Sequence, residues 1–156
     1  MARGAAEVYR DLAPKVLGYL RAQRAAEPQD LLGEVFLQVA RDLPTFRGDD
    51  EHLRRWVFTI ARHRLVDDRR RRKARPQTSD DPVPDRPSPD ESAAGLDAEL
   101  IAALAELTPD QREVVVLRFV ADLPLAAVAR ITRRRVGAIK ALQSRALAQL
   151  GDRLSK

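Results

Sequence analysis

The sequence predicts an all-α protein in which an acidic, proline-rich linker joins two small helical domains. Its 156 residues suffice for one ordinary domain or two small ones. Aromatic residues amount to only 4%, whereas all-β sandwiches and barrels depend on aromatic and β-branched side chains. On both sides of the middle of the chain, apolar residues recur at the three- and four-residue spacings of an amphipathic helix.

The first half contains three such patterns. The first predicts a helix with Pro14 inside it, which we expect to bend or interrupt the early turns. The second follows Pro28, with Asp30 as a candidate N-cap, and ends at Pro44. The apolar stripes of these two helices are Val8, Leu12, Val16, Tyr19 and Leu20, and then Leu32, Val35, Phe36, Val39 and Leu43.

A third pattern runs from about Leu53 into a basic cluster, in which residues 69–73 are five consecutive cations. This cluster is either a solvated helix end, since cations suit a helix C-terminus, or a phosphate-binding segment. Trp56 is likewise either a core residue or a platform for base stacking. The predicted buried stripe is Leu53, Val57, Ile60, Ala61 and Leu65.

The middle of the chain differs sharply in composition. Residues 76–98 hold one arginine, six acidic residues and five of the ten prolines, which gives a net charge of −5. Such a segment buries too little apolar surface to offset its ordering entropy, so we expect a disordered linker. The flanking segments carry +6 (1–75) and +4 (99–156), and we expect these to be two basic domains.

The second half begins with an amphipathic helix that ends near Thr108. Thr108 and Gln111 have the spacing of a capping box, and Pro109 suits the first helical position, so a second helix is expected to begin here. The apolar positions of these two helices are Leu100, Ala103, Leu104 and Leu107, and then Val114, Val115, Leu117 and Val120.

Pro124 then opens a short helix, Leu125 to Ile131, and a last helix follows a break at 132–134 and runs to about Leu150. A short helix, a tight turn and a longer basic helix are typical of a helix-turn-helix motif. Arg133 stands where the turn usually has glycine. The last helix has a predicted buried stripe of Ile139, Leu142, Ala146, Leu147 and Leu150, opposite a face with Gly137, Lys140, Ala141, Ser144 and Arg145.

Several functional classes are excluded or disfavoured. The chain has no cysteine, which excludes disulfides, thiolate metal sites and a cysteine nucleophile. His52 and His63 match no common metal-ligand spacing, and no pair of nucleophile and base is evident. We therefore expect no catalytic residue, no metal, no cofactor and no small-molecule substrate. No apolar run approaches the ~20 residues of a membrane span and no signal peptide is visible, so we expect a cytoplasmic protein without membrane insertion.

Four groups of residues resemble the extracytoplasmic-function (ECF) group of the sigma-70 family of bacterial RNA polymerase sigma factors. Residues 30–37 (Asp30-Leu31-Leu32-Gly33-Glu34-Val35-Phe36-Leu37) are similar to the helix that binds the polymerase clamp. Phe46-Arg47-Gly48-Asp49 and residues 53–62 are similar to the promoter-melting segment, and residues 64–71 to the reader of the −10 element. Residues 107–114 and 136–143 are similar to the −35 domain.

This resemblance implies sigma region 2 in 1–75, sigma region 4 with its helix-turn-helix in 99–156, and three partners: core RNA polymerase, promoter DNA and an anti-sigma protein. Core polymerase would contact Asp30, Leu31, Glu34, Gln38 and Arg41. The −10 element would contact Arg47, Arg54, Arg55, Trp56, Arg62, His63, Asp67, Arg69, Arg70, Arg71 and Arg72. The −35 element would contact Arg134, Arg135, Gly137, Lys140, Ala141, Ser144 and Arg145.

The predicted function is therefore that of a sigma factor, which binds core polymerase and directs promoter-specific initiation, rather than that of an enzyme. Two alternatives remain open. One is a stand-alone helix-turn-helix regulator that acts without polymerase; such proteins usually dimerise, and no dimerisation heptad is visible. The other is a helical adaptor whose basic faces are only solvated.

Overall fold

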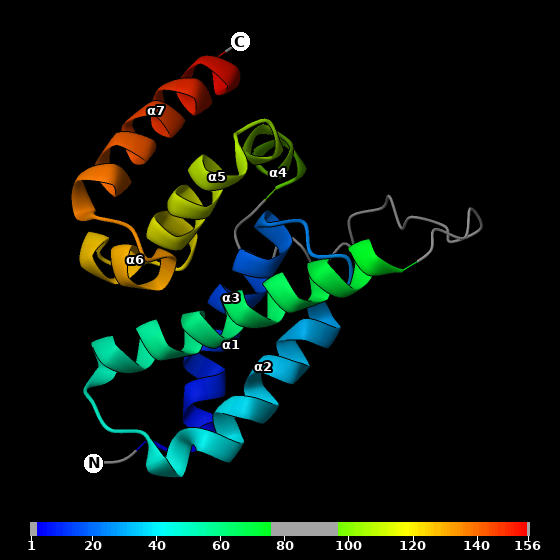
Figure 1. Ribbon diagram of the computed structural model, residues 1–156, viewed down its shortest axis with the longest axis vertical. Helices are drawn as coiled ribbons and strands as arrows, with labels where there is room; N and C mark the ends of the chain where they lie inside the picture. Colours follow the sequence, from blue (N-terminus) through cyan, green and yellow to red (C-terminus); the bar gives the residue numbers. More distant parts are fainter. Residues whose placement is uncertain (1–2, 76–96, 156) are drawn as a thin grey trace.

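Every regular element in the described residues, 3–75 and 97–155, is a helix (Figure 1). This computed structural model confirms the all-α prediction. The predicted linker, residues 76–98, lies outside the described residues except for its last two positions.

The first half folds into α1 (Ala5–Ala22), α2 (Pro28–Asp42) and α3 (Asp50–Ala74), with the 3₁₀ turn η1 (Leu43–Thr45) after α2. Each of the three α-helices packs against the other two. Their predicted stripes meet in a common core, where the rings of Tyr19 and Phe58 lie edge to face with centroids 5.9 Å apart. Edge-to-face contact is a preferred aromatic geometry, so this pair joins α1 to α3.

Two predicted details of this half are wrong. Helix α1 is not interrupted, because it continues from Ala5 to Ala22 with the exposed Pro14 inside it. Helix α2 begins at Pro28 itself, and Glu27 is its N-cap, so Asp30 lies in the first turn. Proline fits the first helical position because the N–H that it lacks would have no partner within the helix there.

The second half contains α4 (Ala98–Ala105), α5 (Pro109–Val115), the π-helical turn η3 (Val116–Val120), α6 (Leu125–Thr132) and α7 (Val136–Leu154). The capping box is confirmed, since Thr108 Oγ1 accepts from the Gln111 N–H and Gln111 Oε1 accepts from the Thr108 N–H, both at 3.2 Å. It fixes where α5 begins, and α5 is the helix on which α7 packs.

The buried face of α7 is narrower than predicted. Ile139, Ala146 and Leu150 are buried at spacings of seven and four, whereas Leu147 is 42% exposed. The prediction for Leu147 is wrong because it lies about 100° around the helix from Ala146, outside the strip that α7 presents to its neighbours.

The helix-turn-helix turn is built in the left-handed geometry, with arginine in place of glycine. Arg133 has φ 58° and ψ 44°, and the N–H groups of Arg133 and Arg134 both donate to the carbonyl of Ala129. These bonds satisfy the carbonyl at the end of α6 and direct the chain into α7.

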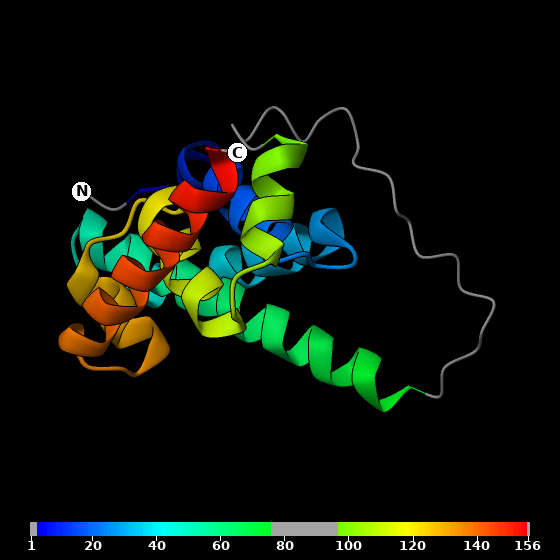
Figure 2. The ribbon, with the colours of Figure 1, turned by 90° about the horizontal axis from the view of Figure 1, so that it is seen from above.

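The two halves also contact one another. Helix α1 packs against η3 and α4, and α3 packs against α6 (Figures 1 and 2). Buried side chains of both halves belong to one continuous cluster. The first helix of the helix-turn-helix therefore lies against the basic helix α3.

Candidate nucleic-acid interface

A glycine turn and an aspartate cap set the start of α3. Asp49 accepts a hydrogen bond from the backbone N–H of His52 at 2.9 Å and contacts its Nδ1 at 2.7 Å. The backbone hydrogen bond, followed by the side-chain one, lowers the pKa of Asp49. Gly48 has φ 147°, and a Cβ there would lie 2.8 Å from the His52 Cβ, so this turn requires glycine. The turn leaves Arg47 exposed ahead of the helix.

One face of α3 is fully available to a partner. His63, Asp67 and Arg70 follow one another at spacings of four and three, and all three are exposed. None of them has a hydrogen bond or ion pair within the described residues. An exposed aspartate between a histidine and an arginine offers an acceptor for base amino groups, with a cation nearby for phosphate.

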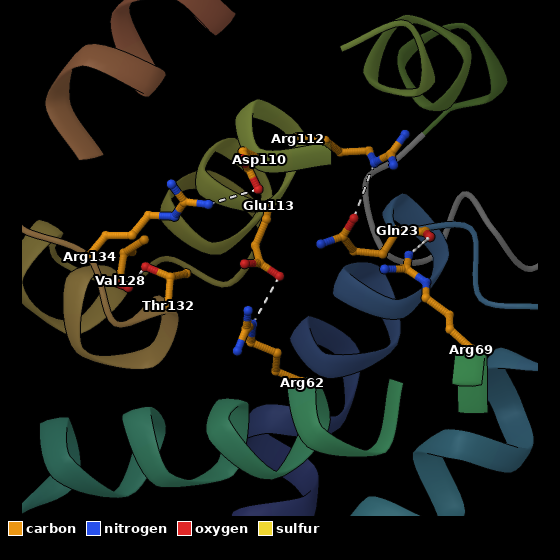
Figure 3. Close-up of polar contacts among 9 residues, drawn as sticks. All are labelled: Gln23, Arg62, Arg69, Asp110, Arg112, Glu113, Val128, Thr132 and Arg134. Carbon is orange, nitrogen blue, oxygen red and sulfur yellow. Dashed lines mark hydrogen bonds and ion pairs between the residues drawn. The ribbon is translucent and has the colours of Figure 1, made fainter. Parts of the chain in front are cut away.

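The neighbouring face of α3 is engaged within the molecule (Figure 3). Arg62 donates from Nε to Glu113 Oε2 of α5 at 3.1 Å, and Arg69 donates to the backbone carbonyl of Gln23 at 2.6 Å. Arg112 of α5 reaches the side chain of the same Gln23 at 3.2 Å. Of the predicted −10 residues, Arg62 is therefore bound to the second half and Arg69 to the end of α1, whereas His63, Asp67 and Arg70 lie on the open face.

Trp56 was predicted to be either a core residue or a platform for base stacking, and its side chain is neither fully buried nor fully exposed. It is half-buried against the core, and its ring is tilted 30° to that of Phe46 at a centroid distance of 4.9 Å. Arg54 and Arg55 beside it are half-buried as well.

The end of α3 and the start of α2 line a groove of about 730 Å³. Asp68 holds Arg72 at 2.8 Å and Arg71 at 3.8 Å on one side. Asp30 and Glu34 lie on the other side. Residues predicted to bind polymerase and residues predicted to bind DNA thus share one groove.

The remaining predicted polymerase contacts differ in accessibility. Gln38 is held by Arg64 of α3, which donates to its Oε1 at 3.1 and 2.9 Å, and Arg41 is exposed. Leu31 is only 2% exposed and is a core residue, so its side chain is withdrawn from the candidate surface. Its neighbour Leu32 is buried too, because α2 packs between α1 and α3.

The predicted −35 face is accessible on α7. Exposed on it are Arg135, Gly137, Lys140, Ala141, Ser144 and Arg145. Arg134 is half-buried and lies 2.8 Å from Asp110 of α5. Helix N-termini and their nearby cations favour phosphate, whereas side chains further along a recognition helix reach base edges.

Sequence reasoning missed several residues of these surfaces. Val136, at the first position of α7, is 40% exposed and adds an apolar side chain to the −35 face. Gln23, Asp68 and Glu113 each hold one or more of the predicted DNA-binding arginines. An exposed apolar residue at a helix start could have been found from sequence, but contacts between helices far apart in the chain could not.

Residues 3–75 and 97–155 contain no group of three or more histidine, aspartate or glutamate side chains arranged to hold a metal ion. In the same ranges no helix has both the length and the apolar character needed to cross a membrane.

Comparison with known proteins places this chain in a family. Residues 8–75 match the model of sigma-70 region 2, and residues 97–150 match that of sigma-70 region 4. The chain is 33% identical over 138 residues to the ECF RNA polymerase sigma factor BldN of Streptomyces coelicolor, covering 85% of this chain and 52% of BldN. It is 33% identical over 123 residues to the RNA polymerase sigma factor CarQ of Myxococcus xanthus, covering 73% of this chain and 70% of CarQ.

A solved structure shows the same fold. The sigma factor RpoE of Bartonella quintana, in complex with the anti-sigma factor NepR, superposes with a TM-score of 0.75 at 22% identity, covering 96% of both chains. The two helical domains and the two region matches define the two-domain architecture of sigma factors. The chain belongs to the ECF group of the sigma-70 family. It spans about half the length of BldN.

Proposed function

We propose that this chain is a sigma factor, which binds core RNA polymerase and directs promoter-specific initiation by reading a −10 and a −35 element. The observation that carries the proposal is the pair of exposed faces on α3 and α7, in domains that match regions 2 and 4. His63, Asp67 and Arg70 would read the −10 strand, while Lys140, Ser144 and Arg145 would read the −35 duplex. The domains would span residues 1–75 and 99–156.

The groove between α2 and α3 is the proposed polymerase contact, with Asp30 and Glu34 in its lining and Gln38 and Arg41 further along α2. A protein held there would lie beside the −10 residues at the end of α3. Bond formation would belong to polymerase, and this chain would have no catalytic role. It would act in the cytoplasm, where bacterial polymerase meets DNA.

An anti-sigma protein is a further proposed partner. The RpoE structure that shares this fold contains an anti-sigma factor. The features that would receive such a protein here are the exposed Tyr9 and Leu37 on the first half and the basic faces of both domains.

In vitro transcription tests the proposal. Purified chain and core polymerase are incubated with a library of promoter fragments, and run-off transcripts are sequenced. We expect initiation from a defined subset that depends on both proteins. A stand-alone regulator would bind DNA without polymerase but give no chain-dependent transcript. A helical adaptor would neither bind DNA nor give a chain-dependent transcript.

A further inference from the structure

The contact between the two halves engages residues that the −10 surface needs. Arg62 donates to Glu113 at 3.1 Å, and the two side chains are only 28% and 16% exposed. The Nε–H of Arg62 that is bound to Glu113 is not free for a phosphate or a base, so Glu113 competes with DNA for this donor.

Other contacts support the same closed arrangement (Figure 3). Gln23 of the first half is 2% exposed and receives hydrogen bonds from Arg69 of α3 and Arg112 of α5. Lys15 of α1 lies 3.5 Å from Asp122, just after η3. Polar contacts therefore join the halves at three separate places, in addition to the packing of α3 against α6.

The junction also brings like charges together. Arg112 lies near two cations of the first half, Arg69 and Arg24. Burial, and then these two cations, lower the pKa of Arg112. The attraction between Arg62 and Glu113 thus acts alongside a repulsion at Arg112.

We propose that Glu113 is an internal competitor for Arg62, so that the contact of α5 and α6 with α3 holds the free chain closed and withholds part of the −10 surface. This inference rests on the proposed function, which assigns Arg62 to the −10 element. The open face of His63, Asp67 and Arg70 and the exposed face of α7 stay accessible in the closed chain. Full −10 binding then requires the two halves to separate.

Fluorescence energy transfer tests closure in the free chain. The sequence has no cysteine, so Ala40→Cys in α2 and Ala148→Cys in α7, both at exposed positions, give one label in each half. We expect Glu113→Arg to lower the transfer efficiency, because it places two cations together. Arg62→Glu combined with Glu113→Arg should restore it, because the pair is then reversed. Equal transfer in all these variants would overturn the proposal.

Single-stranded DNA binding tests the competition. Glu113→Gln should bind a random-sequence single strand up to about fivefold more tightly than the natural chain, because it removes the partly buried ion pair that engages Arg62. Glu106→Gln is the matched control, since it neutralises another arginine-bound carboxylate of the second half, whose partner Arg153 belongs to neither proposed DNA surface. If both variants gained equally, the effect would be one of net charge and the proposal would fail.

Failure of the proposed function can be distinguished from failure of this inference. Energy transfer and strand binding need no polymerase, so they report closure even if the chain gives no promoter-specific transcript. Conversely, promoter-specific transcription with unchanged transfer in Glu113→Arg would leave the proposed function in place and overturn closure.

Discussion

Arg134 lies 2.8 Å from Asp110, so the turn of the helix-turn-helix is tied to the first turn of α5. The pair is largely solvated, with the two side chains 35% and 59% exposed. Its contribution to stability is therefore small, within about 1 kcal/mol. We expect the ion pair to matter more for DNA binding than for stability. Arg134 is also a proposed phosphate contact, and it must leave Asp110 to reach DNA.

We predict that Asp110→Asn strengthens the binding of duplex −35 DNA several-fold at about 50 mM salt, with a smaller gain at about 200 mM. Gel-shift titrations at the two salt concentrations measure this. Asp152→Asn is the control, because it removes one exposed charge of α7 without touching Arg134. The account is contradicted if Asp152→Asn gives an equal gain.

Arg133→Gly should stabilise the protein by about 1 kcal/mol. Arg133 adopts the left-handed conformation, which costs a side chain with a Cβ more than it costs glycine. Urea unfolding measures the change. Arg130→Gly, in the last turn of α6, should instead destabilise by up to about 1 kcal/mol. A loss of stability in both variants would mean that the turn does not carry this strain.

Thr108→Ala should cost about 1 kcal/mol of stability, because it removes the side-chain oxygen that accepts the Gln111 N–H. Thr108→Ser keeps that oxygen and should be close to the natural chain. Thermal unfolding of the three proteins checks the order. An alanine variant as stable as the serine variant would show that the capping box contributes nothing.

The cap of α3 should weaken in acid. Hydrogen bonds from His52 hold the pKa of Asp49 below its usual value, so this group binds protons more weakly in the folded state. Its stabilisation is complete above the unfolded pKa of about 3.9 and is lost as pH falls through the lower folded value. The Tm of the natural chain should exceed that of Asp49→Asn at about pH 6, and this gap should close near pH 2. A gap that widens in acid would contradict the assignment.

Local signals made much of the fold predictable from sequence. The Thr108 to Gln111 box identifies its helix start through groups three residues apart, and both hydrogen bonds are present. Helical spacing identified most of the buried stripe of α3, since Leu53, Val57, Ile60, Ala61 and Leu65 are all buried, but it missed the buried Phe58. The burial of both Leu31 and Leu32 was harder to predict, because a helix that packs on two sides buries neighbouring residues.

The candidate site was less predictable, because its state depends on contacts between distant residues. Arg62 and Glu113 are 51 positions apart, and no periodic pattern pairs them. The same holds for Arg69 and Gln23, which are 46 positions apart. The residue types that face DNA could be proposed from sequence, but which of them are already engaged depends on how the two halves pack.

The central claim, that two surfaces read two separate promoter elements, is tested most directly by sequencing transcripts from a library randomised in both elements. We compare three proteins with core polymerase: the natural chain, the Asp67→Ala variant and the Lys140→Ala variant. Each is used at a concentration that gives the same amount of protein bound to core polymerase. We predict that Asp67→Ala relaxes the preference at one −10 position only, and that Lys140→Ala relaxes the −35 preference only, at about 1–3 kcal/mol for a base contact. Loss of preference in the same element by both variants, or in neither, would contradict the account.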